Sequence, residues 1–437
     1  MTYRFFRRLF YETHLWLGIA SGLILFAVCL SGTILTFQTE FRQIAEPARY
    51  YVDVPDGKDI LSADELIAKV ESAKTAMKVV SITIPEQPHR TVVMNLASSD
   101  QRGERGGQIE QRERGARPES RATPSEGNLR PQGGRGGSRS RNVVYVNPYT
   151  GDIVGEGANV VDPFFMSMMR LHRFLWLPIE IGRPIVGTAT IIFIVLFLSG
   201  LVLWMPKMWN SLATWRAWKS GLRIRFKKGG WALLYDLHNA VGFYVLIPSL
   251  ILALTGLCWS FAWYRDTASY VLGDQIFKQR MQLPEKIEPM GQPEKPLSIA
   301  EMIARKNDLV PGPGEISVSI PTDNETAMVI RKGRTGFFDL NMMNRSQWDH
   351  YRGTVIPVDH HGKMVEVERF ADKPLGAKIA VSIRGLHFGD ITGMSSKIFF
   401  FIACLFATSL PVTGTVWWLK KLRTKYKRRR TCKSSGT

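Results

Sequence analysis

The chain has 437 residues, a formal net charge of +19 and 45% apolar residues. This length exceeds the needs of one ordinary domain, so several structural units are expected. So positive a charge is typical of nucleic-acid binding in a soluble protein, but the basic residues stand beside long apolar stretches. That distribution argues against a nucleic-acid partner.

Four stretches are nearly free of charge and run over residues 15–37, 185–205, 241–263 and 398–418. Each has the roughly 20 apolar residues that a helix needs to cross a hydrocarbon core of about 30 Å. The first is too long for a secretion signal and no small-residue cleavage site follows it, so we interpret it as a retained span. The sequence therefore predicts an all-α membrane part, a four-helix bundle surrounded by membrane lipid.

Basic residues gather in the N-terminal tail, in residues 206–237 and in the C-terminal tail. All three segments lie on one side of a four-span topology, as the positive-inside rule requires. Both termini are therefore predicted to be cytoplasmic. The predicted units are a first transmembrane helix at 1–40, an outer domain at 41–163, a second transmembrane helix at 164–206, a cytoplasmic loop at 207–230, a third transmembrane helix at 231–265, a second outer domain at 266–380, a fourth transmembrane helix at 381–420 and a basic cytoplasmic tail at 421–437.

The spans carry an internal repeat, which indicates a duplicated architecture. His14 is followed by glycines 4 and 18 residues later, and so is His238. The second and fourth spans also match, because His172 precedes the Ser199-Gly200 pair by almost the same spacing as His387 precedes Thr413-Gly414. The chain is thus predicted to contain an internal duplication, in which the order span, outer domain, span occurs twice.

The two outer segments resemble each other as well. A capped amphipathic helix is predicted from residue 61 and again from residue 297, and each is followed by strand-like runs. Two small α+β domains fit this pattern. The first is interrupted by residues 101–141, an arginine- and glycine-rich insertion with almost no large apolar side chains. Such a composition does not offset the entropy of ordering, so we expect the insertion to be disordered.

Four histidines of the repeat suggest a redox function. His14 and His238 open spans that start inside, whereas His172 and His387 precede spans that start outside. A pseudo-two-fold axis along the membrane normal would bring the members of each pair face to face. Facing neutral imidazoles are what a low-spin haem iron needs as axial ligands, so the four are candidate ligands of two b-type haems. The candidate partners of the haem propionates are Arg8, Arg170, Arg173 and Arg384.

In these motifs the chain resembles the PepSY-associated transmembrane family. The resemblance covers nearly all of the chain except 101–141, and the turn from Val146 to Gly151 is similar to the end of a PepSY domain. The second outer domain departs from the pattern near residues 349–353. The motifs that carry the resemblance are His14 with Gly18, Leu171-His172-Arg173 with Gly187 and Ser199-Gly200-Leu201, Leu237-His238 with Gly242 and Thr255-Gly256-Leu257, and Leu386-His387-Phe388-Gly389-Asp390.

The family implies iron uptake at the bacterial inner membrane. Some members are ferric-siderophore reductases whose two haems are ligated by such histidines, and this implies an inner haem on His14 and His238 and an outer haem on His172 and His387. No nicotinamide or flavin fingerprint is present, so a quinol or a separate cytoplasmic reductase is the expected electron donor. A membrane-anchored regulator that binds a protease or sensor through PepSY-like domains, and a transporter, are the alternatives.

Overall fold

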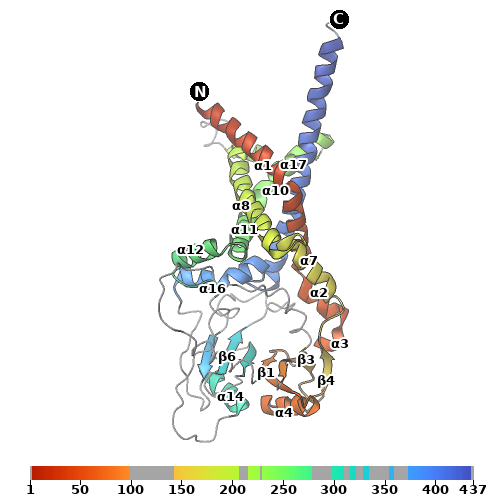
Figure 1. Ribbon diagram of the computed structural model, residues 1–437, viewed down its shortest axis with the longest axis vertical. Coiled ribbons are helices and arrows are strands. Elements are labelled where there is room, and N and C mark those ends of the chain that lie inside the picture. The colour runs from red at the N-terminus through yellow and green to blue at the C-terminus, as the bar shows by residue number, and fades with distance from the viewer. Residues whose placement is uncertain are drawn as a thin grey trace, which may run out of the picture.

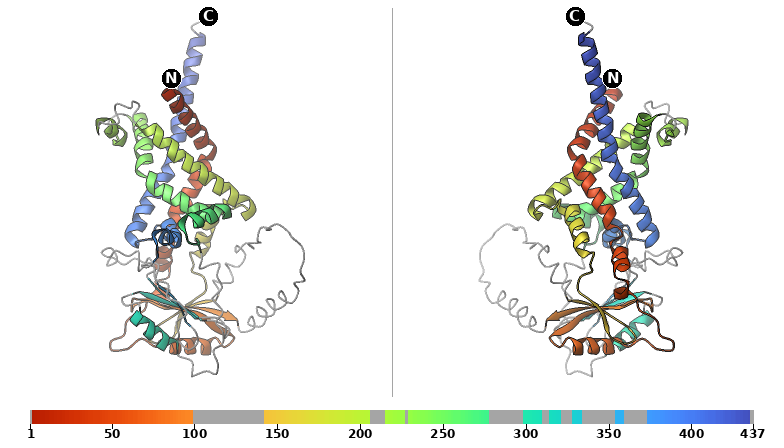
Figure 2. Two further views of the ribbon diagram at one scale, coloured as in Figure 1. Left: turned by 90° about the vertical axis from the view of Figure 1, so that its left-hand side faces the viewer. Right: turned by 90° about the vertical axis from the view of Figure 1, so that its right-hand side faces the viewer.

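A computed structural model describes residues 2–98, 142–205, 215–226, 229–277, 298–309, 314–320, 328–333, 354–358 and 373–434. The molecule has a helix bundle at one end and a β-sheet with its own helices at the other (Figure 1). Both termini lie at the end of the bundle that is far from the sheet (Figures 1 and 2). The predicted insertion at 101–141 lies outside the described residues.

Long apolar helices form the bundle. Among the described residues, three helices are long and apolar enough to cross a membrane, and a fourth span is present if a bent pair of helices counts as one. These elements coincide with the four predicted apolar stretches. They are α1 (Thr2–Leu35), α8 (Ile179–Trp204), α17 (Met394–Ser434) and the bent pair α10 (Gly230–Tyr244) and α11 (Leu246–Ser260).

The bend between α10 and α11 measures 60°. It falls at Val245, whose φ of −91° and ψ of 0° leave the helical region, three residues before Pro248. Because proline has no backbone N–H and crowds the preceding turn, it favours such a break in a helix. α1 packs against both α8 and α17, and the bent pair packs against the same two helices.

Shorter helices surround the bundle. α2 (Gln38–Ala45), α3 (Pro47–Tyr50) and α7 (Asp162–Phe174) connect the bundle to the sheet, while α12 (Ala262–Leu272) and α16 (Leu375–Phe388) lie at the end of the bundle that faces the sheet (Figure 1). At the opposite end, α9 (Trp215–Leu222) packs against α10. The bundle therefore has a sheet-proximal end and a sheet-distal end.

The strands in the described part of the chain form one sheet of seven, in the order β4-β3-β2-β1-β5-β6-β7, and every neighbouring pair is antiparallel. Apolar side chains on one face, such as Ile82, Met94 and Val318, are fully buried against helices on that face. The strands are β1 (Met77–Ile84), β2 (Val92–Ser98), β3 (Val143–Val146), β4 (Ile153–Glu156), β5 (Glu315–Ser319), β6 (Met328–Gly333) and β7 (Thr354–Val358).

The prediction of two separate outer domains is corrected in one respect. Strands from the two segments meet where β1 pairs with β5, with Ile82 opposite Val318, so both segments share one sheet and one core. The physical reason is that β1 and β5 would each present an open strand edge if the halves stood apart, and an unpaired edge is a liability. Joining them closes both edges and buries more apolar surface.

The helices α4 (Ala63–Ala73) and α14 (Ile299–Leu309) cover the face of the sheet turned away from the bundle (Figure 2). At the start of each helix, a serine hydroxyl accepts the backbone N–H of the glutamate three residues later. The carboxylate of that glutamate accepts the backbone N–H of the serine. In the first, hydrogen bonds from the Ser62 backbone and side chain lower the pKa of Glu65. Such reciprocal capping satisfies donors that a helix start leaves open.

Asp64 joins the two halves of this domain. Its carboxylate oxygens, on α4, accept the backbone N–H groups of Ile299 and Ala300 at 3.0 and 2.9 Å. A helix of the first half thereby caps the first turn of α14 in the second half. A carboxylate is favoured there because the N-terminus of a helix carries partial positive charge.

Asp64→Ala should therefore loosen α14. Loss of a capping group costs about 1 kcal/mol, so amide hydrogen exchange in α14 should accelerate about fivefold while the exchange in β2 stays unchanged. Asp59→Ala serves as the control, because it removes an exposed carboxylate just ahead of α4, the helix that carries Asp64. Equal exchange in the two variants would contradict the capping role.

Candidate functional site

The four histidines of the repeat form two facing pairs. His14 on α1 and His238 on α10 make the sheet-distal pair, with ring centres 6.2 Å apart and ring planes at 82°. His172 on α7 and His387 on α16 make the sheet-proximal pair, with ring centres 6.1 Å apart and planes at 49°. Each pair combines one histidine from the first half of the chain with one from the second, as the sequence predicted.

Hydrogen bonds fix the Nδ1 atom of each ring in the sheet-proximal pair. Nδ1 of His172 lies 2.9 Å from the carbonyl oxygen of Val28, and Nδ1 of His387 lies 3.0 Å from that of Leu252. A carbonyl oxygen only accepts hydrogen bonds, so in both rings Nδ1 must carry the proton. The neutral rings then hold their free lone pair on Nε2, the form in which imidazole binds a metal ion.

The sheet-distal pair uses hydroxyl groups for the same purpose. Nδ1 of His14 lies 3.0 Å from the Ser199 oxygen, and Nδ1 of His238 lies 2.9 Å from the Thr413 oxygen. Both hydroxyls donate their own proton to a carbonyl of their own helix, which leaves them as acceptors toward histidine. The same tautomer therefore follows for these two rings.

A glycine lies against each imidazole. A Cβ built on Gly200 or Gly414 would come within 3.2 Å of Cε1 of His14 or His238, and one on Gly32 or Gly256 within 3.0 Å of Cε1 of His172 or His387. These are the glycines of the repeated serine-glycine and threonine-glycine pairs. Each glycine is needed where one imidazole ring packs against it, because a larger residue would displace that ring. This requirement explains the matched histidine-to-glycine spacing in the sequence.

The spacing within each pair fits one metal ion. A metal ion binds an imidazole nitrogen at about 2.0–2.1 Å, and the ring centre lies about 1.1 Å behind it, so two imidazoles on opposite sides of one ion have centres about 6.3 Å apart. The observed 6.2 and 6.1 Å agree with this geometry. Among the described residues no group of three or more His, Cys, Asp or Glu is placed to hold a metal ion.

A cavity of about 930 Å³ adjoins the sheet-distal pair. Its volume is at the upper end of the range for cofactor sites. His14 and His238 both line it, and the glycines Gly18 and Gly22 of α1 let it come close to the backbone. The other walls are mainly apolar and aromatic, including Phe193, Leu196, Phe197, Trp204, Phe243 and Trp417. The cavity has the size and lining that a flat apolar macrocycle requires.

Basic side chains stand at this cavity. Arg8 lines it, and so do Arg7 and Lys421. Arg7 donates to the carbonyl oxygens of Leu203 and Met205 at 2.6 and 3.2 Å, which ties the start of α1 to the end of α8. The site thus offers positive charge for the acidic groups of a ligand.

The other predicted arginines lie near the sheet-proximal pair in the chain, and all are exposed. Arg173 lies over the ring of Phe174 and Arg384 over that of Phe388, at 5.0 and 5.3 Å from the ring centres. Arg170 accepts backbone hydrogen bonds from the turn that ends α7 through its carbonyl oxygen. The structure therefore places Arg8 at a cavity with its histidines, while the roles of the other three stay predictions.

Sequence reasoning missed several residues of the site. Ser199 and Thr413 stood in the repeated motif, but nothing in the pattern showed that their hydroxyls contact a histidine. Arg7 carries no signal in the sequence beyond its place among the basic residues of the N-terminal tail. Trp259, whose ring centre is 5.1 Å from that of His387, had been included in an apolar span because aromatic residues give no separate signal there.

Alanine at Gly200 or Gly414 should displace the facing imidazole. Alanine stabilises a helix interior by about 0.5–1 kcal/mol relative to glycine, so Gly18→Ala, whose Cβ would meet only Leu196 at 3.7 Å, should raise the thermal midpoint, in detergent, of protein prepared without any cofactor. The contact at 3.2 Å should cancel that gain in Gly200→Ala and Gly414→Ala. A rise of equal size in all three variants would show that the histidine rings are not held as described.

No curated protein matches the chain. A family described as the PepSY-associated TM region matches residues 11–421. That range contains all four histidines, the sheet and most of each candidate membrane span. The chain belongs to the PepSY-associated transmembrane family.

Proposed function

We propose that the protein is a di-haem oxidoreductase that passes electrons across the bacterial inner membrane to a ferric chelate, most simply a ferric siderophore. The observation that carries the proposal is the pair of facing imidazole sets, one at each end of the bundle, each at the spacing of two axial ligands. Two such sites in one bundle suit electron transfer along the membrane normal better than they suit a single binding event.

The residues at the sheet-distal pair fit a haem, because the two imidazoles line a cavity with mainly apolar walls, and the sheet-proximal pair has a similar ring spacing. His14 and His238 would hold one haem and His172 and His387 the other, each through Nε2. Hydrogen bonds fix the ring tautomer through Nδ1 at both pairs. At the sheet-distal cavity, Arg7, Arg8 and Lys421 would pair with propionates. When bound, the haems supply one-electron carriers. Second-shell hydrogen bonds of this kind orient the ligand and raise its basicity.

The topology is part of the proposal. Basic residues of α9, of the start of α1 and of the end of α17 lie at the sheet-distal end (Figures 1 and 2), so the positive-inside rule assigns that end to the cytoplasm and the sheet to the periplasm. The matched contacts of the histidines with glycines of their own half support an internal duplication. They also support the interpretation of the bent pair α10–α11 as one span in a four-helix bundle.

The direction of electron flow follows from this topology. A quinol in the membrane or a reduced cytoplasmic enzyme would supply electrons at the sheet-distal pair, and a ferric ion in the periplasm would accept one electron to become ferrous. Iron bound by a siderophore is held far more weakly in the ferrous state, because hard oxygen ligands prefer the smaller and more highly charged ion. The released iron is then available for uptake.

Substituting one histidine of each pair should remove one haem at a time. His14→Ala is expected to abolish one of two low-spin species in a redox titration of the purified protein, and His172→Ala the other. His89→Ala is the control, because His89 stacks on Tyr51 in the sheet domain and belongs to neither pair. Loss of both species in every variant, or of neither, would contradict independent sites.

Reduction of a ferric chelate across a membrane tests the activity itself. Proteoliposomes loaded with a membrane-impermeant reductant should form ferrous iron from an external ferric hydroxamate, detected with a ferrous-specific dye. His172→Ala should lower this rate at least tenfold, since it removes one of two steps in series. A haem-containing protein that transfers no electrons to the chelate would instead favour the membrane-anchored regulator.

A further inference from the structure

The short helix α2 contacts both halves of the chain, and each half supplies one histidine of the sheet-proximal pair. It has eight residues and follows α1 at the sheet-proximal end of the bundle. Two of its charged side chains, Glu40 and Arg42, reach different neighbours. Glu40 contacts α17 of the second half of the chain, whereas Arg42 contacts the start of α7 in the first half.

The contact of Glu40 with Lys397 is a buried ion pair. The ammonium group donates to both carboxylate oxygens at 2.6 and 2.8 Å, and the side chains are only 10% and 6% exposed. Lys397 stands in the first turn of α17 and follows His387 by ten residues. Its ammonium also lies 5.5 Å from the ring centre of Phe37, which in turn contacts Phe401 of α17. This cluster fixes α2 to the second half.

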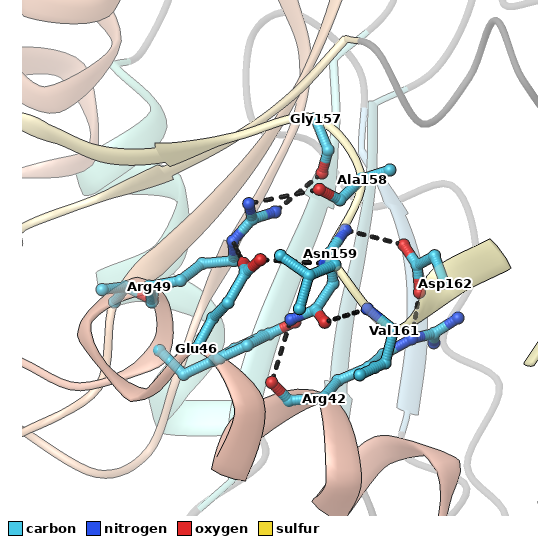
Figure 3. Close-up of polar contacts among 11 residues, drawn as sticks. Arg42, Glu46, Arg49, Gly157, Ala158, Asn159, Val161 and Asp162 are labelled. Carbon is cyan, nitrogen blue, oxygen red and sulfur yellow. Dashed lines mark hydrogen bonds and ion pairs between the residues drawn. The ribbon is translucent and has the colours of Figure 1, made fainter. Parts of the chain in front are cut away.

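The contact of Arg42 with Asp162 belongs to a wider hydrogen-bond network (Figure 3). Nε of Arg42 donates to Asp162, and the Asn159 side chain donates to the Arg42 carbonyl oxygen at 2.9 Å. The Asp162 carboxylate also accepts the Asn159 backbone N–H at 2.8 Å. Asp162 is the first residue of α7, ten residues before His172. At about 1.5 Å per residue, the Arg42–Asp162 contact and His172 are roughly 15 Å apart along α7.

The same network holds the chain between the sheet and α7. Arg49 donates to the carbonyl oxygens of Gly157 and Ala158 (Figure 3). Glu46 accepts the backbone N–H of Val160. Arg49 and Glu46 are themselves paired. The segment that follows β4 is therefore fixed to α2 and α3 before it enters α7.

α7 is thus held to the α1–α2 segment at two places. At one end His172 meets Val28 and Ser31 of α1 through Nδ1, and at the other Asp162 meets Arg42. Two fixed points on antiparallel helices set the position of α7 along its axis. That position decides where the His172 ring lies relative to its partner ring.

We propose that Glu40 and Arg42 are positioning residues that set the geometry of the sheet-proximal histidine pair. The inference rests on the proposed function, because it assigns these residues to the outer haem. Arg42 sets His172 through α7, and Glu40 sets His387 through Lys397 and the start of α17. One short helix consequently determines how the two axial ligands from different halves of the chain face each other.

The second half of the chain has a different arrangement at this point. The helix that follows α11 is α12, which is described throughout and has no buried residue. Asp274, just beyond α12, lies 3.9 Å from Lys373, just ahead of α16. That distance is too long for a hydrogen bond. α12 instead meets α16 through apolar contacts, in a cluster that includes Ile276, Ala380 and Ile383.

Electron paramagnetic resonance of the oxidised protein provides the test, because the g-values of a low-spin haem depend on the relative orientation of its two axial imidazoles. Arg42→Gln removes a partly exposed pair, and Glu40→Gln removes the carboxylate from the buried Lys397. Glu40→Gln with Lys397→Met removes both buried charges and guards against a misfolded single variant. Lys74→Gln is the control, since Lys74 pairs with Glu156 inside the sheet domain at an exposure matching that of Arg42.

The signal assigned to the sheet-proximal haem by its loss in His172→Ala should shift in Arg42→Gln and shift further in both Glu40→Gln variants. Arg42→Lys should restore most of the wild-type signal, and the sheet-distal signal should not move. The positioning role would be overturned, with the proposed function left standing, if neither haem signal shifted in Arg42→Gln and in the double variant. Equal shifts of both haem signals would have the same meaning. A folded wild-type protein without any low-spin haem signal would instead overturn the proposed function.

Discussion

Each of the four imidazoles is held between a hydrogen bond at Nδ1 and a glycine at Cε1, both supplied by a neighbouring helix of the same half of the chain. A net hydrogen bond contributes only about 1 kcal/mol, but a buried ring nitrogen without a partner costs more. The contacts therefore define the ring orientation more than they stabilise the fold. The two facing pairs depend on this constraint, because a rotated ring would no longer present Nε2 to its partner.

The constraint also explains why the two halves are built as they are. The glycine and the hydrogen-bond acceptor come from one helix and the histidine from another helix of the same half, so each half holds its own rings, and the two halves meet where the rings face each other. Elsewhere the halves are joined by stronger means, through the β1–β5 pairing, the Asp64 cap on α14 and the buried Glu40–Lys397 pair. Breaking a buried ion pair by removing one partner is costly, typically 3–5 kcal/mol.

Much of this architecture could be predicted from the sequence, for physical reasons. The spans follow from apolar length, and the pairing of His14 with His238 and of His172 with His387 follows from the repeat and the alternation of span direction. The single sheet could not be predicted, because strand pairing between distant segments leaves no local pattern. The roles of Ser199, Thr413 and Arg7 were also hidden, since a hydroxyl or a guanidinium shows its partner only after the helices are packed.

The haem content of the purified wild-type protein tests the central claim most directly. The protein would be extracted in detergent from haem-replete cells, quantified by amino-acid analysis and assayed for haem as the pyridine complex. The facing histidine pairs predict two non-covalently bound b-type haems per chain. A folded protein that is colourless under these conditions would contradict the account and leave the histidine pairs without a metal.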